Sequence, residues 1–254
     1  MFNPYSSESA RIVKITPQTD SISLFRFEFT QKIWGYNFNF KPGQFIELSI
    51  PGLGEAPFAP CGASEAGYLE LCVRRAGALS EKLHSMKIGD EVGIRGPYGN
   101  GWPTRIEYSD SINAGKESPT NANNEISHSR GIASPRSSGA RNNDPPNILI
   151  VVGGLGLVPL RALILEKDKF LGADAKVQIF YGAKSPQDFL FKDEFAKWRA
   201  QGINLELTID NVCAGWNECV GAVTALFDKH NVAPSATAFL CGPPVMYKFV
   251  LEKL

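Results

Sequence analysis

The sequence lacks an excess of charge of either sign, a long apolar run and a recognisable export signal. Twenty-six Lys and Arg residues balance 26 Asp and Glu residues in a chain of 254, so general nucleic-acid binding is not expected. No apolar run approaches the ~20 residues that a helix needs to cross a bilayer. The opening Met-Phe-Asn-Pro-Tyr-Ser-Ser-Glu has neither the basic nor the apolar segment of a signal peptide. We therefore expect a cytoplasmic protein with no membrane partner.

Cysteine and histidine are also scarce. The five cysteines are scattered and odd in number, which argues against a disulfide framework. No Cys-x-x-Cys pair occurs, and the spacing of Cys213 and Cys219 fits no common cluster or zinc motif. The three histidines are far from any candidate nucleophile or metal ligand in the sequence: His84, His128 and His230. A histidine-based triad or metal centre is therefore not predicted.

The hydrophobic content of 43% and charged content of 20% are typical of a soluble globular protein. The first hundred residues contain short segments rich in β-formers with turn signals between them. These segments are residues 11–15, 22–29, 45–50, 68–74 and 92–94. In residues 68–74 the alternation places Leu69, Leu71 and Val73 on the buried side. Such a pattern favours a small antiparallel β-barrel.

One helix interrupts the β pattern. The chain runs from Arg74 and Arg75 through Gly77 into a helix for which Ser80 is the predicted N-cap. The two arginines and the free N–H groups of this turn can hold a pyrophosphate. The alternative is a capped surface helix with solvated arginines.

Residues 104–146 differ in composition from the rest of the chain. Ser, Asn, Gly, Arg and Pro dominate, and large apolar side chains are sparse. Such a segment buries too little surface to offset its ordering entropy, so we interpret it as a low-complexity insertion or linker.

After residue 147 strands and helices alternate. The predicted strands are residues 148–152, 177–181, 204–209 and 238–241, and the predicted helices include residues 186–200 and 221–229. Right-handed β–α–β units of this kind form a Rossmann-like parallel sheet whose ligands bind beyond the carboxyl ends of the strands. The fold class expected for the chain is therefore a two-domain β plus α/β protein.

The stretch Ile148-Leu149-Ile150-Val151-Val152-Gly153-Gly154-Leu155-Gly156 describes a buried strand that turns tightly into a helix. Its glycines let the backbone approach a ligand, and Pro159 suits the first helical turn. The N–H groups and dipole at the helix start attract an anion. The alternative is a strand–helix junction that needs glycine for packing alone. A second turn, at Gly242, lies at a corresponding strand end and favours nucleotide binding.

Five motifs in order resemble the ferredoxin–NADP reductase superfamily: Lys41-Pro42-Gly43-Gln44-Phe45, Gly96-Pro97-Tyr98-Gly99, Gly153-Gly154-Leu155-Gly156-Leu157-Val158-Pro159, Tyr181-Gly182-Ala183 and Cys241-Gly242-Pro243-Pro244-Val245-Met246. Further segments, among them Asp188-Phe189-Leu190-Phe191-Lys192-Asp193-Glu194, are similar to one branch. That branch is the gamma (diaphorase) subunit of sulfhydrogenases and NiFe hydrogenases, with a subunit of anaerobic sulfite reductase as a close cousin. The implied domains are a flavin-binding barrel at 1–103 and a nucleotide domain at 147–254.

The resemblance implies FAD in the barrel and NAD(H) or NADP(H) in the second domain, with hydride passing between nicotinamide C4 and flavin N5. The flavin then exchanges single electrons with an iron–sulfur partner subunit or ferredoxin of a hetero-oligomer. By resemblance, the FAD pyrophosphate is lined by Gly77, Ala78, Leu79 and Ser80. The nucleotide pyrophosphate faces Gly153, Gly154 and Gly156. The nicotinamide lies at Cys241, Gly242 and Pro243, and Asp210 is a further pocket residue.

Two features depart from the family pattern. The flavin signature Arg-x-Tyr-Ser or Arg-x-Tyr-Thr corresponds here to Ala56-Pro57-Phe58-Ala59. Phe58 can still stack on the flavin ring, and Arg74 with Arg75 can replace the lost charge. The branch also continues beyond its last helix into a cysteine-rich tail that binds a [2Fe–2S] cluster. The residues up to Leu254 contain no such ligands, so we expect none in this chain.

The leading hypothesis is therefore a flavin-dependent NAD(P)H oxidoreductase subunit, with Cys241 and Phe58 beside the reacting rings. A degenerate, non-catalytic homologue that binds a nucleotide or a partner is the alternative, motivated by the two departures. A dehydrogenase with another substrate has no acid–base set to support it. Lys184 follows a predicted strand and can meet a 2′-phosphate, but an exposed loop lysine is the commoner case, so NAD and NADP stay open.

Overall fold

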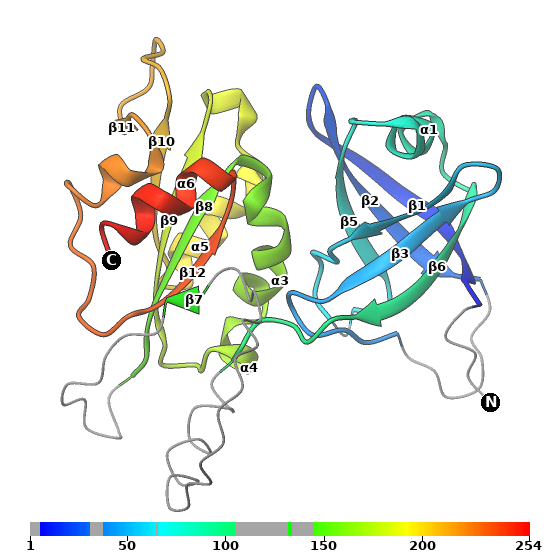
Figure 1. The fold of residues 1–254 in the computed structure, drawn as a ribbon, viewed down its shortest axis with the longest axis horizontal. Coiled ribbons are helices and arrows are strands. Elements are labelled where there is room, and N and C mark those ends of the chain that lie inside the picture. The colour runs from blue at the N-terminus through cyan, green and yellow to red at the C-terminus, as the bar shows by residue number, and fades with distance from the viewer. Residues whose placement is uncertain (1–5, 31–37, 65, 105–131, 134–144) are drawn as a thin grey trace, which may run out of the picture. The chain divides into compact units, whose positions relative to one another are not determined.

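The computed structural model describes residues 6–30, 38–64, 66–104, 132–133 and 145–254 (Figure 1). The chain forms two compact units. The first comprises Met1–Trp102 together with Gly154–Glu166 and Ala183–Asp193, and the second comprises Pro103–Gly153, Lys167–Gly182 and Glu194–Leu254. The predicted insertion at 104–146 lies almost wholly outside the described residues.

The first unit is built on an antiparallel β-barrel. Its strands are β1 (Glu8–Thr19), β2 (Ile22–Phe29), β3 (Phe45–Ile50), β4 (Gly54–Phe58), β5 (Leu69–Arg74) and β6 (Glu91–Tyr98). They pair in the order β4-β3-β6-β1-β2-β5, and an antiparallel bridge between Pro60 and Leu71 joins the two edges of this sheet. Alternating apolar side chains fill the interior, among them Phe25, Phe27 and Leu48. The predicted barrel is confirmed.

Strand β5 is buried on both of its faces. Leu69, Leu71 and Val73 point into the barrel core as predicted, but Glu70 and Cys72 on the opposite face are only 3% and 5% exposed. The single buried face predicted for residues 68–74 is therefore an incomplete description. The second face is covered because side chains from elsewhere in the same unit pack on it, as described below.

Helix α1 (Ala78–Ser85) begins after Gly77 and not after Ser80. The predicted N-cap is therefore wrong by one turn. The Ser80 hydroxyl lies at the third helical position, where it accepts hydrogen bonds from the N–H groups of Ala76 (2.9 Å) and Gly77 (3.0 Å) and donates one to the Gly77 carbonyl (2.9 Å). The serine thus stabilises the helix start from inside the helix.

The second sheet contains five parallel strands and one antiparallel edge strand. Its strands are β7 (Ile132–Ala133), β8 (Asn147–Gly153), β9 (Lys176–Ala183), β10 (Asn204–Ile209), β11 (Cys219–Val220) and β12 (Thr237–Cys241). Their order is β11-β10-β9-β8-β12-β7, with β7 antiparallel to β12. The central strands are apolar on both sides, as parallel strands covered on two faces require. The predicted parallel sheet is confirmed.

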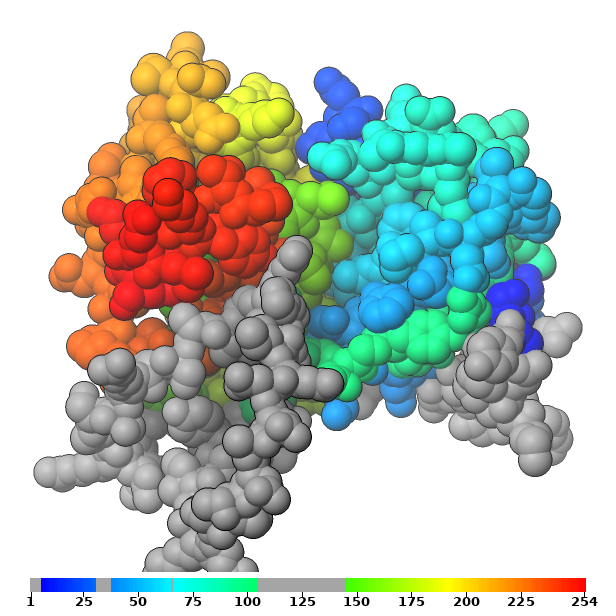
Figure 2. Space-filling view, in the orientation of Figure 1, coloured from blue at the N-terminus to red at the C-terminus, as the bar shows by residue number. Residues whose placement is uncertain are grey.

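Helix α6 (Pro244–Leu251) covers one face of this sheet. Met246 and Val250 pack against Leu149 and Val151, together with the 3₁₀ turn η4 (Val223–Leu226). On the opposite face, the ring of Phe195 in α5 (Phe195–Ala200) lies 6.2 Å from that of Tyr181. The outer side of α6 forms part of the molecular surface in Figure 2. Within the described residues, no helix has the length and apolar character needed to cross a membrane.

Two predicted helices are shorter than expected. Residues 186–200 form the turns η2 (Pro186–Asp188) and η3 (Lys192–Glu194) before α5 begins. Phe189, Leu190 and Phe191 are all buried, and a helix cannot bury three consecutive residues on one face. Phe191 also adopts a positive φ of 55°. Of residues 221–229, only η4 is helical.

The predicted helix after Gly153 is divided into short pieces. The turn η1 (Gly154–Leu157) leads into α3 (Val158–Leu165), and α4 (Lys167–Phe170) follows. Gly172, with φ 105°, comes just after α4 and ends the helical segment.

Candidate functional site

The two glycine-containing turns meet at the carboxyl ends of β8 and β12. These strands are parallel neighbours, with Val152 beside Cys241. A Cβ atom at Gly242 would lie 3.1 Å from the Gly153 nitrogen, and one at Gly153 would lie 3.0 Å from Cδ of Pro243. A side chain at either position would press on the neighbouring turn or on the end of Met246. The structure therefore brings together three of the predicted nucleotide-site residues at the edge where parallel sheets bind ligands.

Met246 fills the space above both glycines, a role that the sequence did not indicate. Its Sδ lies 3.2 Å from the position of a Cβ at Gly153 and 2.8 Å from that of a Cβ at Gly242. Packing of α6 against the two turns is thus sufficient to require glycine at both positions. These two glycines alone do not distinguish phosphate binding from close packing.

Gly154 differs from its neighbour. It adopts φ 52° at the start of η1, and a Cβ built on it meets no atom within 4 Å. The next residues turn inward: Gly156 and Leu157 are buried, and α3 then begins with Pro159 in its first turn. Open space beside a glycine that precedes the first amides of a helix is the arrangement that accepts a phosphate.

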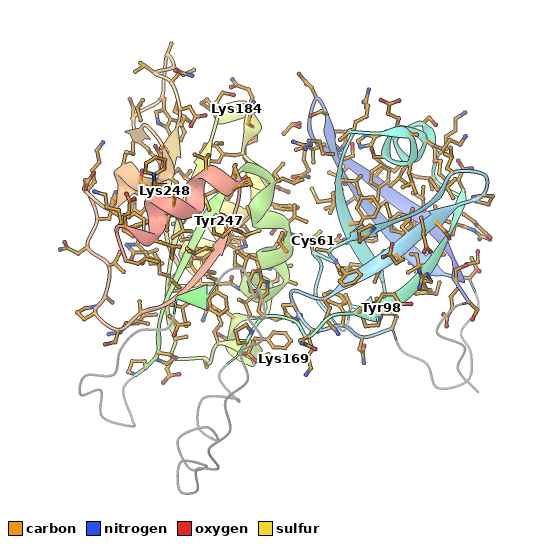
Figure 3. All side chains as sticks on the ribbon, viewed as in Figure 1. Cys61, Tyr98, Lys169, Lys184, Tyr247 and Lys248 are labelled. Carbon is orange, nitrogen blue, oxygen red and sulfur yellow. The ribbon has the colours of Figure 1, made fainter. Side chains whose placement is uncertain are left out.

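Cys241 lies half-buried at the end of β12. Burial raises the pKa of its thiol, and a hydrogen bond with the hydroxyl of Tyr247 opposes this effect. The same hydroxyl donates to the Leu240 carbonyl over 3.4 Å, and Figure 3 shows Tyr247 on α6. The thiol is therefore neutral at physiological pH and is not an activated nucleophile. It suits contact with an uncharged ring better than covalent chemistry.

Asp210 and Lys184 each follow a strand of the parallel sheet. Asp210 is exposed just beyond β10, and β10 is separated from β8 by β9. No described contact joins Asp210 to the glycine turns. Lys184 is exposed after the end of β9, where Figure 3 marks it.

Phe58 is the last residue of β4, near the closure of the barrel. Its ring is partly exposed and packs against the barrel core. The bridge between Pro60 and Leu71 runs antiparallel, so Phe58 lies toward the end of β5 at which Arg74 leaves the sheet. Helix α1 contacts β4. The barrel therefore brings Phe58 and the turn that opens α1 to the same end.

The turn that opens α1 is exposed from Arg74 to Ala78. Ser80 has its hydroxyl committed to the local backbone, so its contribution to an anion site is structural. The amides of Ala78 and Leu79 stand in the first turn of the helix, where no earlier turn offers them a carbonyl. These amides, the open side of Gly77 and the exposed guanidinium of Arg74 fit the charge of a pyrophosphate.

Arg161 and Glu70 form a buried ion pair that the sequence did not reveal. Their nearest oxygen and nitrogen atoms are 2.8 Å apart, and both side chains are almost fully buried. Arg161 belongs to α3 and Glu70 to β5, both in the first unit. The sequence did contain a signal for this pair. Arg161 and Glu70 are charged residues within otherwise apolar predicted elements, and such charges are rarely buried unless they are paired.

Comparisons with known proteins assign the two parts of the chain to a flavin-binding and a nucleotide-binding family. Residues 9–102 match the family described as "Oxidoreductase FAD-binding domain", and residues 150–252 match "Oxidoreductase NAD-binding domain". The chain is similar to "Sulfhydrogenase 2 subunit gamma" of Pyrococcus furiosus, with 32% identity over 99% of this chain and 80% of the relative. "Sulfhydrogenase 1 subunit gamma" of the same organism is 30% identical over 99% and 76%.

A solved structure has the same fold. The chain resembles a "ferredoxin NADP+ reductase from Neisseria gonorrhoeae with bound FAD and NADP", with a TM-score of 0.66, 17% identity and coverage of 96% of this chain and 89% of the other. That likeness concerns the fold alone. The identity to the two gamma subunits is sufficient to assign the family. The chain belongs to the family of FAD- and NAD-binding oxidoreductases that includes the sulfhydrogenase gamma subunits.

Proposed function

We propose that this chain is the flavin-dependent NAD(P)H oxidoreductase subunit of an electron-transfer complex, passing electrons between a pyridine nucleotide and an iron–sulfur partner. The bound nucleotide and flavin supply hydride and single-electron chemistry, while the protein supplies placement, electrostatics and exclusion of water. The observation that carries the proposal is the open space at Gly154, directly before the first amides of the helical segment and at the sheet edge where the Gly153 and Gly242 turns meet.

In the nucleotide half, the backbone of one continuous turn holds the pyrophosphate. Gly153, Gly154 and Gly156 allow the approach, and Pro159 fixes the first turn of α3. Cys241, Gly242 and Pro243 border the nicotinamide, with the neutral thiol of Cys241 toward the ring. Asp210, exposed at the end of β10, is proposed for the more distant ribose end of the ligand.

In the flavin half, Phe58 stacks on the isoalloxazine and the opening of α1 holds the pyrophosphate. The backbone of Gly77, Ala78 and Leu79 provides the N–H groups, Ser80 holds the turn in shape, and Arg74 supplies positive charge. A partly exposed phenylalanine at the barrel end, close to an exposed N–H-rich turn, supports this assignment. Phe58 replaces the tyrosine of the flavin signature without its hydroxyl.

The partner is proposed to be a protein that carries iron–sulfur centres, because the relatives are named as gamma subunits of sulfhydrogenases. A flavin accepts an electron pair from a nucleotide and can release it as single electrons, which suits an iron–sulfur acceptor. Among the described residues, no group of three His, Cys, Asp or Glu side chains is placed to hold a metal ion. By analogy with these subunits, we propose a hetero-oligomer in which a partner carries the iron–sulfur centre.

The test is reconstitution with FAD. Purified protein, with and without added FAD, is freed of unbound flavin by gel filtration, and its absorption spectrum and diaphorase activity with an artificial acceptor are measured. We expect a stoichiometric flavin band and acceptor reduction that depends on NADH or NADPH. Protein that takes up no FAD yet binds NADH in calorimetry would support the non-catalytic homologue instead.

A further inference from the structure

Helix α3 begins at the glycine turn and is held at three levels to the barrel of the first unit. Near its start, the indole N–H of Trp102 donates to the Pro159 carbonyl over 2.9 Å. Just past its end, the carboxylate of Glu166 accepts hydrogen bonds from the N–H (2.7 Å) and hydroxyl (3.0 Å) of Ser64. The middle level is Arg161. Three polar attachments along one short helix fix its translation and its rotation, which apolar packing alone does not do.

Arg161 is the only one of these attachments that carries a fully buried charge, within the described residues. Its Nη1 donates to Glu70 Oε2 and to the Cys61 carbonyl, each over 2.8 Å. Its guanidinium lies 4.3 Å from the ring centroid of Phe191. Arg161 is 5% exposed and Glu70 3% exposed. The guanidinium is therefore constrained by an ion pair, a carbonyl and a ring face at once.

Glu70 is itself fixed from the other side. Its Oε1 accepts hydrogen bonds from Arg26 Nε (3.1 Å) and Nη2 (2.8 Å). The guanidinium of Arg26 lies 3.9 Å from the centroid of the Tyr68 ring. Both carboxylate oxygens are thus engaged, and the Arg26–Glu70–Arg161 chain runs from β2 through β5 to α3.

The two barrel groups that Arg161 contacts both lead into the proposed flavin site. Cys61 follows Phe58 by three residues, and Glu70 precedes Arg74 by four residues in the same strand. The helix that carries Arg161 starts at the turn proposed for the nucleotide pyrophosphate. One side chain therefore connects the backbone segments of both cofactor sites.

A buried ion pair is weak evidence for stability, because an apolar pair of similar volume often serves as well. The geometry at Arg161 is more specific than stability requires, since a methionine can fill the space but cannot fix a helix by directional bonds. Rotation of α3 would move the amides of its first turn. A displacement of about 1 Å between reacting groups can lower a rate by about 100-fold.

We propose that Arg161, acting through Glu70 and the Cys61 carbonyl, is a positioning residue that fixes the nucleotide-binding end of α3 on the flavin barrel. The role rests on the proposed function. It concerns the rate of electron transfer from nucleotide to flavin. The separate affinities for the two cofactors stay nearly unchanged, because the guanidinium is engaged by Glu70, the Cys61 carbonyl and the Phe191 ring, and the Trp102 and Ser64 attachments still hold the two ends of α3.

The test uses the full chain with Arg161→Met and Glu70→Gln combined, so that neither buried charge is left unpaired and Arg26 keeps an acceptor. The control combines Arg11→Gln and Glu91→Gln, which removes an exposed ion pair of 2.9 Å in the same barrel. Three quantities are measured for each protein: affinity for FAD and for NADH by calorimetry, the rate of flavin bleaching at saturating NADH, and hydrogen exchange of the amides of residues 162–166 without cofactors.

We expect the double variant to keep both affinities within about threefold, to lose about 100-fold in the bleaching rate and to exchange the α3 amides faster than the control. A bleaching rate within about threefold of wild type would overturn the role. Amide exchange identical to that of the control would also overturn it, since α3 would then be held without Arg161. Wild-type protein that binds neither cofactor overturns the proposed function itself, and this result appears before any variant is compared.

Discussion

Replacing Gly154 by asparagine separates the two explanations of the glycine turn, packing and phosphate binding. Gly153 and Gly242 cannot make this distinction because neighbouring atoms already exclude a side chain from both. Gly154 has a φ of 52° and open space where a side chain would stand. Asparagine is among the residues that tolerate this left-handed conformation. The substitution therefore fills the proposed phosphate space while leaving the fold nearly undisturbed.

The size of each effect follows from the geometry. A left-handed backbone destabilises the folded state by about 1–2 kcal/mol for most L-residues and by less for asparagine. Replacing a glycine also reduces the conformational entropy of the unfolded chain, which stabilises the protein by about 0.4–1 kcal/mol. The free energy of unfolding should change by less than about 1 kcal/mol. Loss of one hydrogen bond to a charged phosphate costs about 1.5–3 kcal/mol, so the Kd for NADH should rise about 10- to 150-fold.

Gly202→Asn is the matched control. Gly202 follows α5 with φ 79° and nothing within 4 Å of an added Cβ, so the backbone cost is the same. Calorimetric titration with NADH and urea unfolding are compared for the two variants. We expect equal stability and weakened NADH binding in Gly154→Asn only. If folded Gly154→Asn binds NADH as tightly as the control does, the turn is a packing feature and the reasoning fails.

Three further predictions concern the barrel. Glu70→Gln leaves the buried guanidinium of Arg161 without its carboxylate and should lower the free energy of unfolding by about 3–5 kcal/mol in urea; a loss below about 1 kcal/mol would contradict the buried pair. Burial raises the pKa of the Cys61 thiol from 9.0 to about 12, so its contribution to stability is complete below pH 9 and is lost as pH rises toward 12. Between pH 9 and 10, wild type should lose about 1 kcal/mol more than Cys61→Ala, and parallel urea curves would refute the assignment. Phe58→Ala should weaken FAD binding about tenfold through lost stacking, measured by quenching of flavin fluorescence, whereas Phe45→Ala, another partly exposed barrel aromatic, should not.

The glycine turns were predictable from sequence because their cause is local. A short apolar run from Ile148, rich in β-branched residues and ending in glycine, favours a buried strand that turns away from the sheet, and Gly242 repeats that pattern after β12. Parallel pairing of these strands then follows from topology rules, and it places the two turns side by side. The pattern could not show that Met246 packs against both glycines. Because of this packing, the glycines have a structural explanation as well as a phosphate-binding one.

The buried ion pair could not be predicted because its cause is distant. Arg161 and Glu70 are separated by 91 residues, and alternation in β5 indicates which side faces the barrel but not what covers the other side. The shortened helix at 186–200 has a similar origin. Its apolar residues fit a helical period loosely, yet Phe189, Leu190 and Phe191 are all buried. Three consecutive residues can be buried in the non-helical segment between η2 and η3, but not on one face of a helix.

Ser80 shows that the sequence near a helix start predicts the helix but not its exact first residue. A serine near a helix start indicates capping, and the structure confirms that its hydroxyl serves the helix terminus. The residue at the boundary is Gly77 because a side chain three positions inside the helix can reach back to the free N–H groups. The element was predicted correctly, but its first residue was not.

The central claim is that electrons pass from a pyridine nucleotide to a flavin held by this chain. Anaerobic titration of the FAD-reconstituted protein with NADH, and in parallel with NADPH, tests it most directly. We expect the flavin absorption to bleach in proportion to added nucleotide, with an end point near one equivalent per flavin. A flavin band that persists with excess of both nucleotides, in protein shown by calorimetry to bind them, would contradict the account.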